Sequence, residues 1–354
     1  MRVAVAGSVN ECYTGSSTGH ASEGRAGDTA EVTRFTHAGI GDLRAPVYWA
    51  LFATALLLGF SASGAIATTG QAIDAATDYS VVGPYQVETR EMSVLRSGGD
   101  DPFEARLFVP LPTEAGTAAD ERSAMYAFGH GYLSPIEPYE STLRHLASWG
   151  ITVVAPRSGR ELFPSHERFA ADLLAALDAV TMAAGEDDWP GLPVDPTARA
   201  VGGHSMGGGA AVLAVEMDPT VRTVATLTAA DTRPSAVEAA AAVTVPVLLV
   251  AGSEDRITPV DANQRPIFEA AGGPAQLRIL DGGGHCGFLD QADLIGLVCG
   301  RSTLDAETQR TYGQALLTAW IRGEAMDDAD AATTAWAEDP TGIASVEVKG
   351  IEPT

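Results

Sequence analysis

Lysine is almost absent from this chain of 354 residues, in which Lys349 is the only one. The 22 basic residues are outnumbered by 46 acidic ones, so the formal net charge at pH 7 is −24. Proteins that bind nucleic acid need a basic cluster, and its absence excludes nucleic acid as a partner. Anionic membranes would also repel the chain. Two explanations of the acidity stay open: a salty habitat, where about 1 M salt shortens the Debye length to roughly 3 Å, or a high-GC coding bias.

Patterns of metal ligands are missing as well. The sequence contains neither a Cys-x-x-Cys nor a His-x-x-x-His pair, so we expect no metal and no cofactor. Cysteine is scarce, with only Cys12, Cys286 and Cys299. Loss of an N-terminal leader with Cys12 would leave two cysteines, which allows a Cys286–Cys299 disulfide in an oxidising compartment. Export favours this bridge over the alternative, two buried free thiols.

Charged residues are missing from one long stretch near the N-terminus, between Ala45 and Ile73. Residues 45–67 are predicted to be a signal peptide that ends in the small residues Ala65-Ile66-Ala67, or else a membrane anchor long enough to span a bilayer. Both place the following residues outside the cytoplasm, and we favour cleavage and secretion. Residues 1–44 are rich in small and polar residues and are expected to be a disordered leader, unless the true start lies downstream.

From about Asp78 the sequence alternates between apolar strands and amphipathic helices, which predicts a catalytic domain over residues 78–325 followed by an acidic tail over residues 326–354. Such alternation is typical of an α/β fold with a mainly parallel sheet and helices on both faces. The first two strands alternate apolar and polar residues, as an antiparallel edge pair does. Eight strands are predicted, at residues 85–95, 103–110, 124–131, 151–156, 198–203, 221–228, 245–252 and 275–282.

The segment "GGHSMGGG", residues 202–209, follows one of these strands and opens a helix. Its centre fits the pattern G-x-S-x-G, which places a serine on a sharp strand-to-helix turn. The glycines leave room for neighbouring backbone, and Gly208 and Gly209 are expected to let the helix approach the sheet. Free N–H groups at the start of the helix suit a developing oxyanion. The pattern therefore predicts Ser205 as a nucleophile.

A serine hydroxyl needs a base, and the base needs an acid that orients it. In a strand–turn–helix setting of this kind, the partners follow in the order serine, acid, histidine. His285 follows the last predicted strand in a glycine-rich loop and is the predicted base. Asp255 follows the preceding strand and is the predicted acid, with Glu254 and Asp231 as alternatives. His204 is expected to pack beneath the turn.

An oxyanion needs two N–H donors. Met206, directly after the serine, is predicted to supply one, and the loop "GHGYLSP" after the third strand the other, from the N–H of Tyr132. Ordinary loop packing is the alternative for His130 and Tyr132. The segment between the sixth strand and the acid is short, so we expect no large cap domain over the site.

The motifs "GHSMGGG", "GYLSP", "DRITP", "VGPYQVETREMSV" and "LLAALDAVT" resemble the secreted cutinase-like polyesterases, which include the poly(ethylene terephthalate) hydrolases. These belong to the dienelactone-hydrolase-like branch of the α/β-hydrolases, and the resemblance covers roughly residues 79–324. It implies an α/β-hydrolase fold and ester hydrolysis without a cofactor. It also implies Ser205, Asp255 and His285 as the triad, with Tyr132 and Met206 as backbone donors.

Two positions depart from that family. Ala230 stands where the polyesterases carry a tryptophan that forms an aromatic wall, which weakens the case for aromatic polyesters. Cys286 directly follows the histidine and, with Cys299, looks more like the chlorophyllase and platelet-activating-factor-acetylhydrolase-like relatives. The resemblance therefore leaves the substrate open.

Together these features predict a secreted, monomeric ester hydrolase that works through an acyl-enzyme and accepts bulky or polymeric esters. The apolar segment would bring it to a membrane only if uncleaved. The alternatives are a peptidase or thioesterase on the same scaffold, and a chlorophyllase-like or lipid acyl-ester hydrolase. A non-catalytic binding protein is a further alternative, since a fold does not determine function.

Overall fold

The computed structural model describes residues 77–96, 101–113, 121–290, 299–300 and 302–351. The predicted leader (1–44) and the predicted signal peptide or anchor (45–67) lie outside these residues. Within the described ranges, no helix combines the length and the apolar character needed to cross a membrane.

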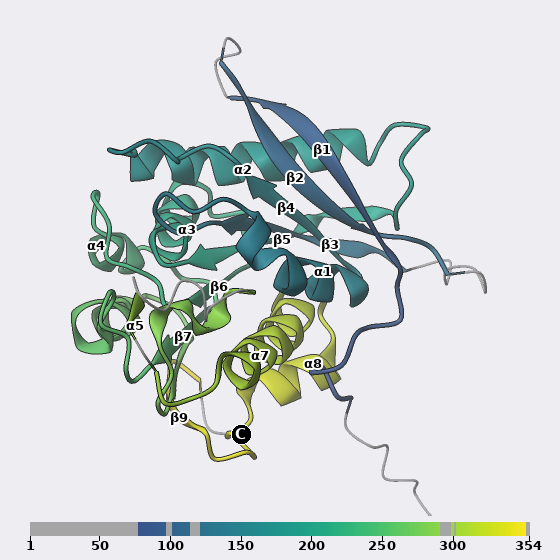
Figure 1. Cartoon of the computed structure of the whole chain (residues 1–354). Coiled ribbons are helices and arrows are strands. Elements are labelled where there is room, and N and C mark those ends of the chain that lie inside the picture. Colours follow the sequence, from purple (N-terminus) through teal and green to yellow (C-terminus); the bar gives the residue numbers. More distant parts are fainter. Residues whose placement is uncertain (1–76, 97–100, 114–120, 291–298, 301, 352–354) are drawn as a thin grey trace, which may run out of the picture. The chain divides into compact units, whose positions relative to one another are not determined.

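The described strands form one mixed sheet with the order β1-β2-β4-β3-β5-β6-β7-β8-β9 (Figure 1). Strands β4, β3, β5, β6, β7 and β8 run parallel to one another, whereas β1, β2 and β9 join in antiparallel pairs. The expected α/β architecture and its antiparallel edge pair are confirmed. The strands are β1 (Val87–Leu95), β2 (Pro102–Pro110), β3 (Ser123–Gly129), β4 (Ile151–Pro156), β5 (Val194–His204), β6 (Thr223–Leu227), β7 (Val247–Gly252), β8 (Ala275–Leu280) and β9 (Ala344–Lys349).

Two layers of helices bury the two faces of the central strands. Successive side chains of a strand point to opposite faces, so Met125 of β3 lies in one apolar cluster and Tyr126 in the other. The first cluster includes side chains of α2, α3, α4 and α5, and the second those of α1, α7 and α8. The helices are α1 (Glu140–Ser148), α2 (His166–Ala183), α3 (Met206–Met217), α4 (Ala236–Ala240), α5 (Gln264–Ala270), α7 (Ala306–Met326) and α8 (Ala329–Trp336).

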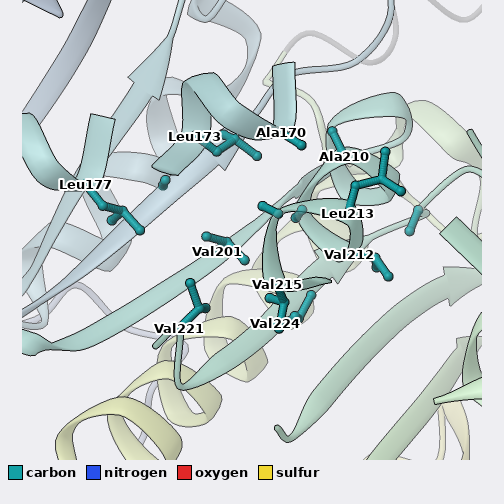
Figure 2. Packing of buried hydrophobic residues seen from close by; sticks show 14 of the residues in the cluster. Ala170, Leu173, Leu177, Val201, Ala210, Val212, Leu213, Val215, Val221 and Val224 are labelled. Atoms are coloured by element: carbon teal, nitrogen blue, oxygen red, sulfur yellow. The ribbon is translucent and has the colours of Figure 1, made fainter. Parts of the chain in front are cut away.

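Helices α2 and α3 pack their apolar sides over the strand that leads to the serine. Figure 2 shows Leu173 and Leu177 of α2 near Val201 of β5, and Leu213 next to Ala210 on α3. Burial of one leucine side chain contributes about 1.5–3 kcal/mol. The start of α2 agrees with its sequence, because the Ser165 side chain accepts the N–H of Arg168 at 3.2 Å as an N-cap. This packing fixes the position of the end of β5, which leads directly into Ser205.

The structure differs from the sequence expectation at the C-terminal end. Residues 326–354 are expected to form an acidic tail, but they contain α8 and β9, so the sheet has nine strands among the described residues rather than the eight predicted. Trp336 of α8 packs on Trp320 of α7, with ring centroids 4.5 Å apart. In β9, Val346 and Val348 alternate with polar residues, and the strand pairs with β8. The acidic composition of the segment hid this short alternation.

Candidate active site

The strand-to-helix turn at the end of β5 holds Ser205 in a strained backbone conformation. Ser205 has φ 57° and ψ −120°, a left-handed φ that a residue with a Cβ rarely adopts. Its N–H donates to the carbonyl of Leu227 at 3.0 Å, and its carbonyl accepts the N–H of Ala230 at 2.9 Å. Both partners belong to the end of β6 and the loop after it, so the neighbouring strand holds the turn in place.

Close backbone approach explains the glycines around the serine. A Cβ added to Gly207 would lie 2.1 Å from the carbonyl oxygen of Gly129, and one added to Gly203 would lie 2.3 Å from it. On the other side of the helix, a Cβ on Gly209 would lie 2.2 Å from the carbonyl oxygen of Ala230. No side chain fits at these three positions, because there the chain packs directly on the backbone of Gly129 and Ala230.

His285 and Asp255 form a buried pair at the carboxyl ends of β8 and β7. The Nδ1 atom of His285 lies 2.7 Å from Oδ2 of Asp255, and both side chains are almost completely buried. The other oxygen, Oδ1, accepts the N–H groups of Ile257 and Thr258 at 2.8 Å and 2.9 Å. Burial would raise the pKa of Asp255, but the interaction with His285 and the bonds from Thr258 outweigh it, so this pKa lies below its ordinary value.

The two alternative acids point elsewhere. The carboxylate of Glu254 accepts the N–H and the hydroxyl of Thr303, at 2.8 Å and 3.0 Å. Asp231 accepts the hydroxyl of Ser235 at 2.8 Å and the N–H of Val237, in the first turn of α4, at 3.2 Å. Of the three candidate acids, the structure therefore brings only Asp255 into contact with His285.

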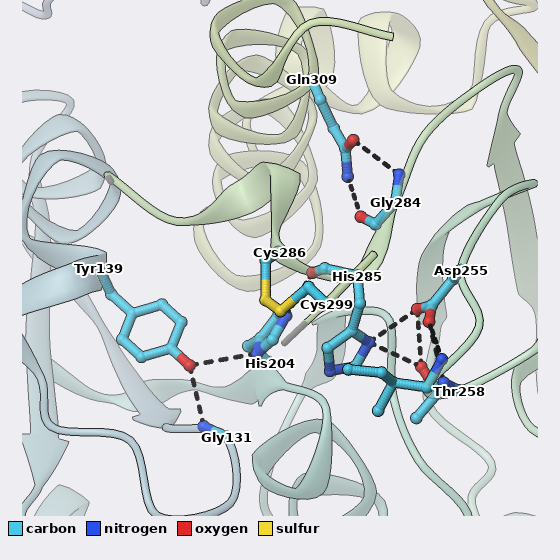
Figure 3. The surroundings of a disulfide bond; sticks show 11 residues. Gly131, Tyr139, His204, Asp255, Thr258, Gly284, His285, Cys286, Cys299 and Gln309 are labelled. Atoms are coloured by element: carbon cyan, nitrogen blue, oxygen red, sulfur yellow. Dashed lines mark hydrogen bonds and ion pairs between the residues drawn. A yellow bond between two sulfur atoms is a disulfide. The ribbon is translucent and has the colours of Figure 1, made fainter. Parts of the chain in front are cut away.

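Side chains from distant parts of the chain hold the loop that carries His285 (Figure 3). The amide of Gln309, on α7, donates to the carbonyl of Gly284 at 2.7 Å and accepts its N–H at 3.0 Å. A disulfide joins Cys286 to Cys299, whose Cα atoms are 5.9 Å apart, and the predicted pairing is thereby confirmed. The residues on both sides of the histidine are thus fixed, which limits how far its imidazole can move.

Ser205 lies next to this pair without a direct hydrogen bond to it. The ring of the preceding residue, His204, is 4.6 Å from that of His285, centroid to centroid, and Ser205 itself is 7% exposed. Among the described residues, the Ser205 hydroxyl has no hydrogen-bond partner. Catalytic hydrogen bonds are often long in structures without substrate and shorten when substrate binds.

Two backbone N–H groups beside Ser205 are available to a ligand. Met206 is the first residue of α3, where the N–H has no acceptor within the helix. The N–H of Gly131 donates to the hydroxyl of Tyr139 at 3.0 Å, but that of the next residue, Tyr132, has no acceptor in the described part of the chain. A Cβ on Gly131 would lie 3.6 Å from that of Ser205, so this loop packs against the turn.

Three further residues, which no sequence motif indicates, complete the site. The hydroxyl of Thr258 lies 2.8 Å from Oδ2 of Asp255 and 3.1 Å from Nδ1 of His285. Thr258 belongs to the motif "DRITP", in which the sequence pointed only to Asp255. Tyr139 and Gln309 carry no local motif, because their partners lie in other loops of the fold. No group of three or more metal-ligating side chains occurs among the described residues.

Comparison with known proteins gives the family. Residues 66–293, more than half of the chain, match the model of the family described as PET hydrolase-like. The chain belongs to the PET hydrolase-like family. It is also 30% identical over 159 residues to "Lipase 1" of Moraxella sp. (strain TA144), over 44% of this chain and 46% of that relative. The match thus spans about half the length of that relative. The PET hydrolase-like segment contains the serine turn, the Asp255–His285 pair and both candidate N–H donors, and family membership confirms the expected fold class.

Proposed function

We propose that this protein is a carboxylic-ester hydrolase in which Ser205 is the nucleophile, His285 the general base and Asp255 the residue that orients the imidazole. The observation that carries the proposal is the buried His285–Asp255 contact of 2.7 Å, which lies beside a serine held on a strained turn. Membership of the PET hydrolase-like family and the similarity to a lipase support ester substrates.

The hydrogen bond from Nδ1 of His285 to Asp255 assigns the tautomer. Because Nδ1 carries the proton, Nε2 has a free lone pair and can take the hydroxyl proton of Ser205 as Oγ attacks the ester carbonyl. The carbonyl oxygen becomes an oxyanion, which the N–H groups of Tyr132 and Met206 stabilise. His285 then protonates the departing alcohol, and an acyl-enzyme remains. Water attacks the acyl-enzyme in the same way, gives its proton to His285 and releases the carboxylic acid.

The site favours substrates with a bulky group beside the serine. Ala230 hydrogen-bonds the Ser205 carbonyl through its N–H, and its small side chain leaves space where the related polyesterases have a tryptophan. Tyr132, whose N–H is a candidate oxyanion donor, is 49% exposed, and its hydroxyl donates to the carbonyl of Leu162 at 2.6 Å. We place the enzyme outside the cytoplasm, in keeping with its disulfide.

This function is tested by measuring kcat for hydrolysis of p-nitrophenyl butyrate by wild type, Ser205→Ala and Ser123→Ala. Ser123, at the other end of β3, is a buried serine whose hydroxyl lies 2.7 Å from that of Thr152, so it controls for loss of a buried hydroxyl. We expect Ser205→Ala to lose at least about 10⁴-fold in kcat and Ser123→Ala to keep the wild-type kcat within about threefold. Equal rates for wild type and Ser205→Ala would remove the proposal. Faster turnover of matched thioesters or amides would favour a thioesterase or peptidase.

A further inference from the structure

A tyrosine and a histidine beneath the candidate active site connect three of its segments: the loop of Gly131, the turn at Ser205 and the loop of His285. Tyr139, the last residue of the 3-10 helix Glu137–Tyr139, is 1% exposed, and His204, the last residue of β5, is 2% exposed. The hydroxyl of Tyr139 lies 3.1 Å from Nδ1 of His204, and it accepts the N–H of Gly131 at 3.0 Å. The other ring nitrogen, Nε2, lies 2.9 Å from the carbonyl oxygen of His285. Figure 3 shows the Tyr139 contacts below the disulfide.

Only one arrangement of protons satisfies these contacts. The carbonyl of His285 can only accept, so the proton of His204 sits on Nε2. Burial, together with a smaller effect of the charge of His285, lowers the pKa of His204 to about 3, so the ring is neutral and Nδ1 is an acceptor. The Tyr139 hydroxyl therefore donates to Nδ1, and its oxygen accepts the N–H of Gly131. The bonds run in one direction from the Gly131 loop to the His285 loop.

We propose that Tyr139 and His204 are positioning residues, which set the Tyr132 N–H and the His285 imidazole at fixed places relative to Ser205. The inference rests on the proposed ester hydrolysis. Tyr139 binds the N–H of Gly131, so the peptide that follows is held with its own N–H free for the oxyanion. His204 holds the peptide of His285, and it precedes the nucleophile directly in the chain.

The hydroxyl of Tyr139 matters to this role more than its ring does. A phenylalanine would keep nearly the same volume against Phe128, whose ring centroid is 5.0 Å away, but it would leave the Gly131 N–H and Nδ1 of His204 without their partner. The loop of Gly131 and the loop of His285 could then shift independently of each other. A displacement of about 1 Å in a catalytic group costs on the order of 100-fold in rate.

The chain offers a matched control in Tyr126. Its side chain is also completely buried, and its hydroxyl donates to the carbonyl of Ala225 on β6 at 2.7 Å. That bond joins two strands and touches neither the serine turn nor the loops of Tyr132 and His285. Tyr126→Phe therefore removes a buried tyrosine hydroxyl with a structural role only.

The test measures kcat and KM for p-nitrophenyl butyrate, together with thermal unfolding, in wild type, Tyr139→Phe and Tyr126→Phe. We expect Tyr139→Phe to lower kcat by about 10-fold to 100-fold with KM within about threefold of wild type. Tyr126→Phe should lose comparable thermal stability and keep kcat within about threefold. Equal kcat in the two variants overturns the inference, whereas a wild type without esterase activity overturns the proposed function instead.

A double-mutant cycle with His204→Gln separates positioning from general loosening. The glutamine amide can still donate to the His285 carbonyl, but it does not reproduce the Nδ1 acceptor of the imidazole. If the two residues act through one bridge, the kcat of Tyr139→Phe/His204→Gln should be no more than about threefold below that of the worse single variant. Fully multiplicative losses would show that the residues act separately and would contradict the inference.

Discussion

The turn at Ser205 and the loop at His285 lie at the same edge of the sheet, yet different contacts hold them. At the serine turn, backbone packs on backbone: Gly203 and Gly207 approach Gly129 so closely that an added Cβ would lie within 2.3 Å of its carbonyl oxygen. At the histidine loop, side chains from α7, from residue 299 and from the loop after β7 hold the chain.

This difference has a physical cause. The nucleophile needs a strained φ, and a strained turn is stable only where the surrounding backbone leaves it no alternative. The histidine needs a defined ring orientation in an unstrained loop, and hydrogen bonds to its neighbours and to Nδ1 supply it. We therefore expect small changes of volume to damage the turn and losses of polar groups to damage the loop.

Gly207→Ala should have the largest effect on the turn. The new Cβ would lie 2.1 Å from the Gly129 oxygen, and relief of this contact must move α3 away from β3 together with Ser205. We expect kcat for p-nitrophenyl butyrate to fall by at least about 100-fold. Gly185→Ala, where the nearest atom is the Met182 oxygen at 3.4 Å, is the control and should keep wild-type activity. An active Gly207→Ala enzyme would contradict the backbone-contact explanation.

Gln309→Leu should have a smaller effect on the histidine loop. It leaves both the N–H and the carbonyl of Gly284 without a partner, while Asp255 and the disulfide still hold the loop. We expect kcat to fall about 10-fold and the free energy of unfolding to fall by about 2–4 kcal/mol. Gln314→Leu, on the same helix, removes two longer contacts of 3.3 Å and should leave kcat unchanged. A kcat loss in both variants would point to α7 itself rather than to the Gly284 contact.

Acid should weaken the protein through His204. Its pKa is lowered to about 3 in the folded chain because burial disfavours the charged ring, while the unfolded value is about 6.5. Between these values the unfolded chain binds a proton that the folded chain does not, so stability falls as the pH drops below about 6.5.

Urea unfolding at pH 7 and at pH 5 measures this effect. Wild type should lose about 2 kcal/mol more than His204→Gln over that interval, because the variant lacks the buried imidazole. The same loss of stability in both proteins would mean that other groups, such as the buried His145, account for the acid sensitivity.

Local signals in the sequence predicted most of the fold and part of the site. The eight strands and the turn at Ser205 follow from short motifs, because each depends on residues a few positions apart. Asp255 and His285 were predicted from their places directly after two of these strands. Tyr139 and Gln309 could not be found in this way, since their partners lie at His204 and at Gly284. Strand β9 was not predicted for a related reason. Its acidic segment has only a short alternation of its own, and it is a strand because it pairs with β8.

The most direct test of the central claim is the site at which a fluorophosphonate reacts. Such a probe forms a covalent bond with an activated serine, so intact mass and peptide mapping reveal which hydroxyl was attacked. We predict one adduct per chain, on the peptide that contains Ser205, with none on the Ser205→Ala variant and slow labelling of Asp255→Asn. An adduct on another residue, or no adduct on an enzyme that hydrolyses esters, would contradict the account.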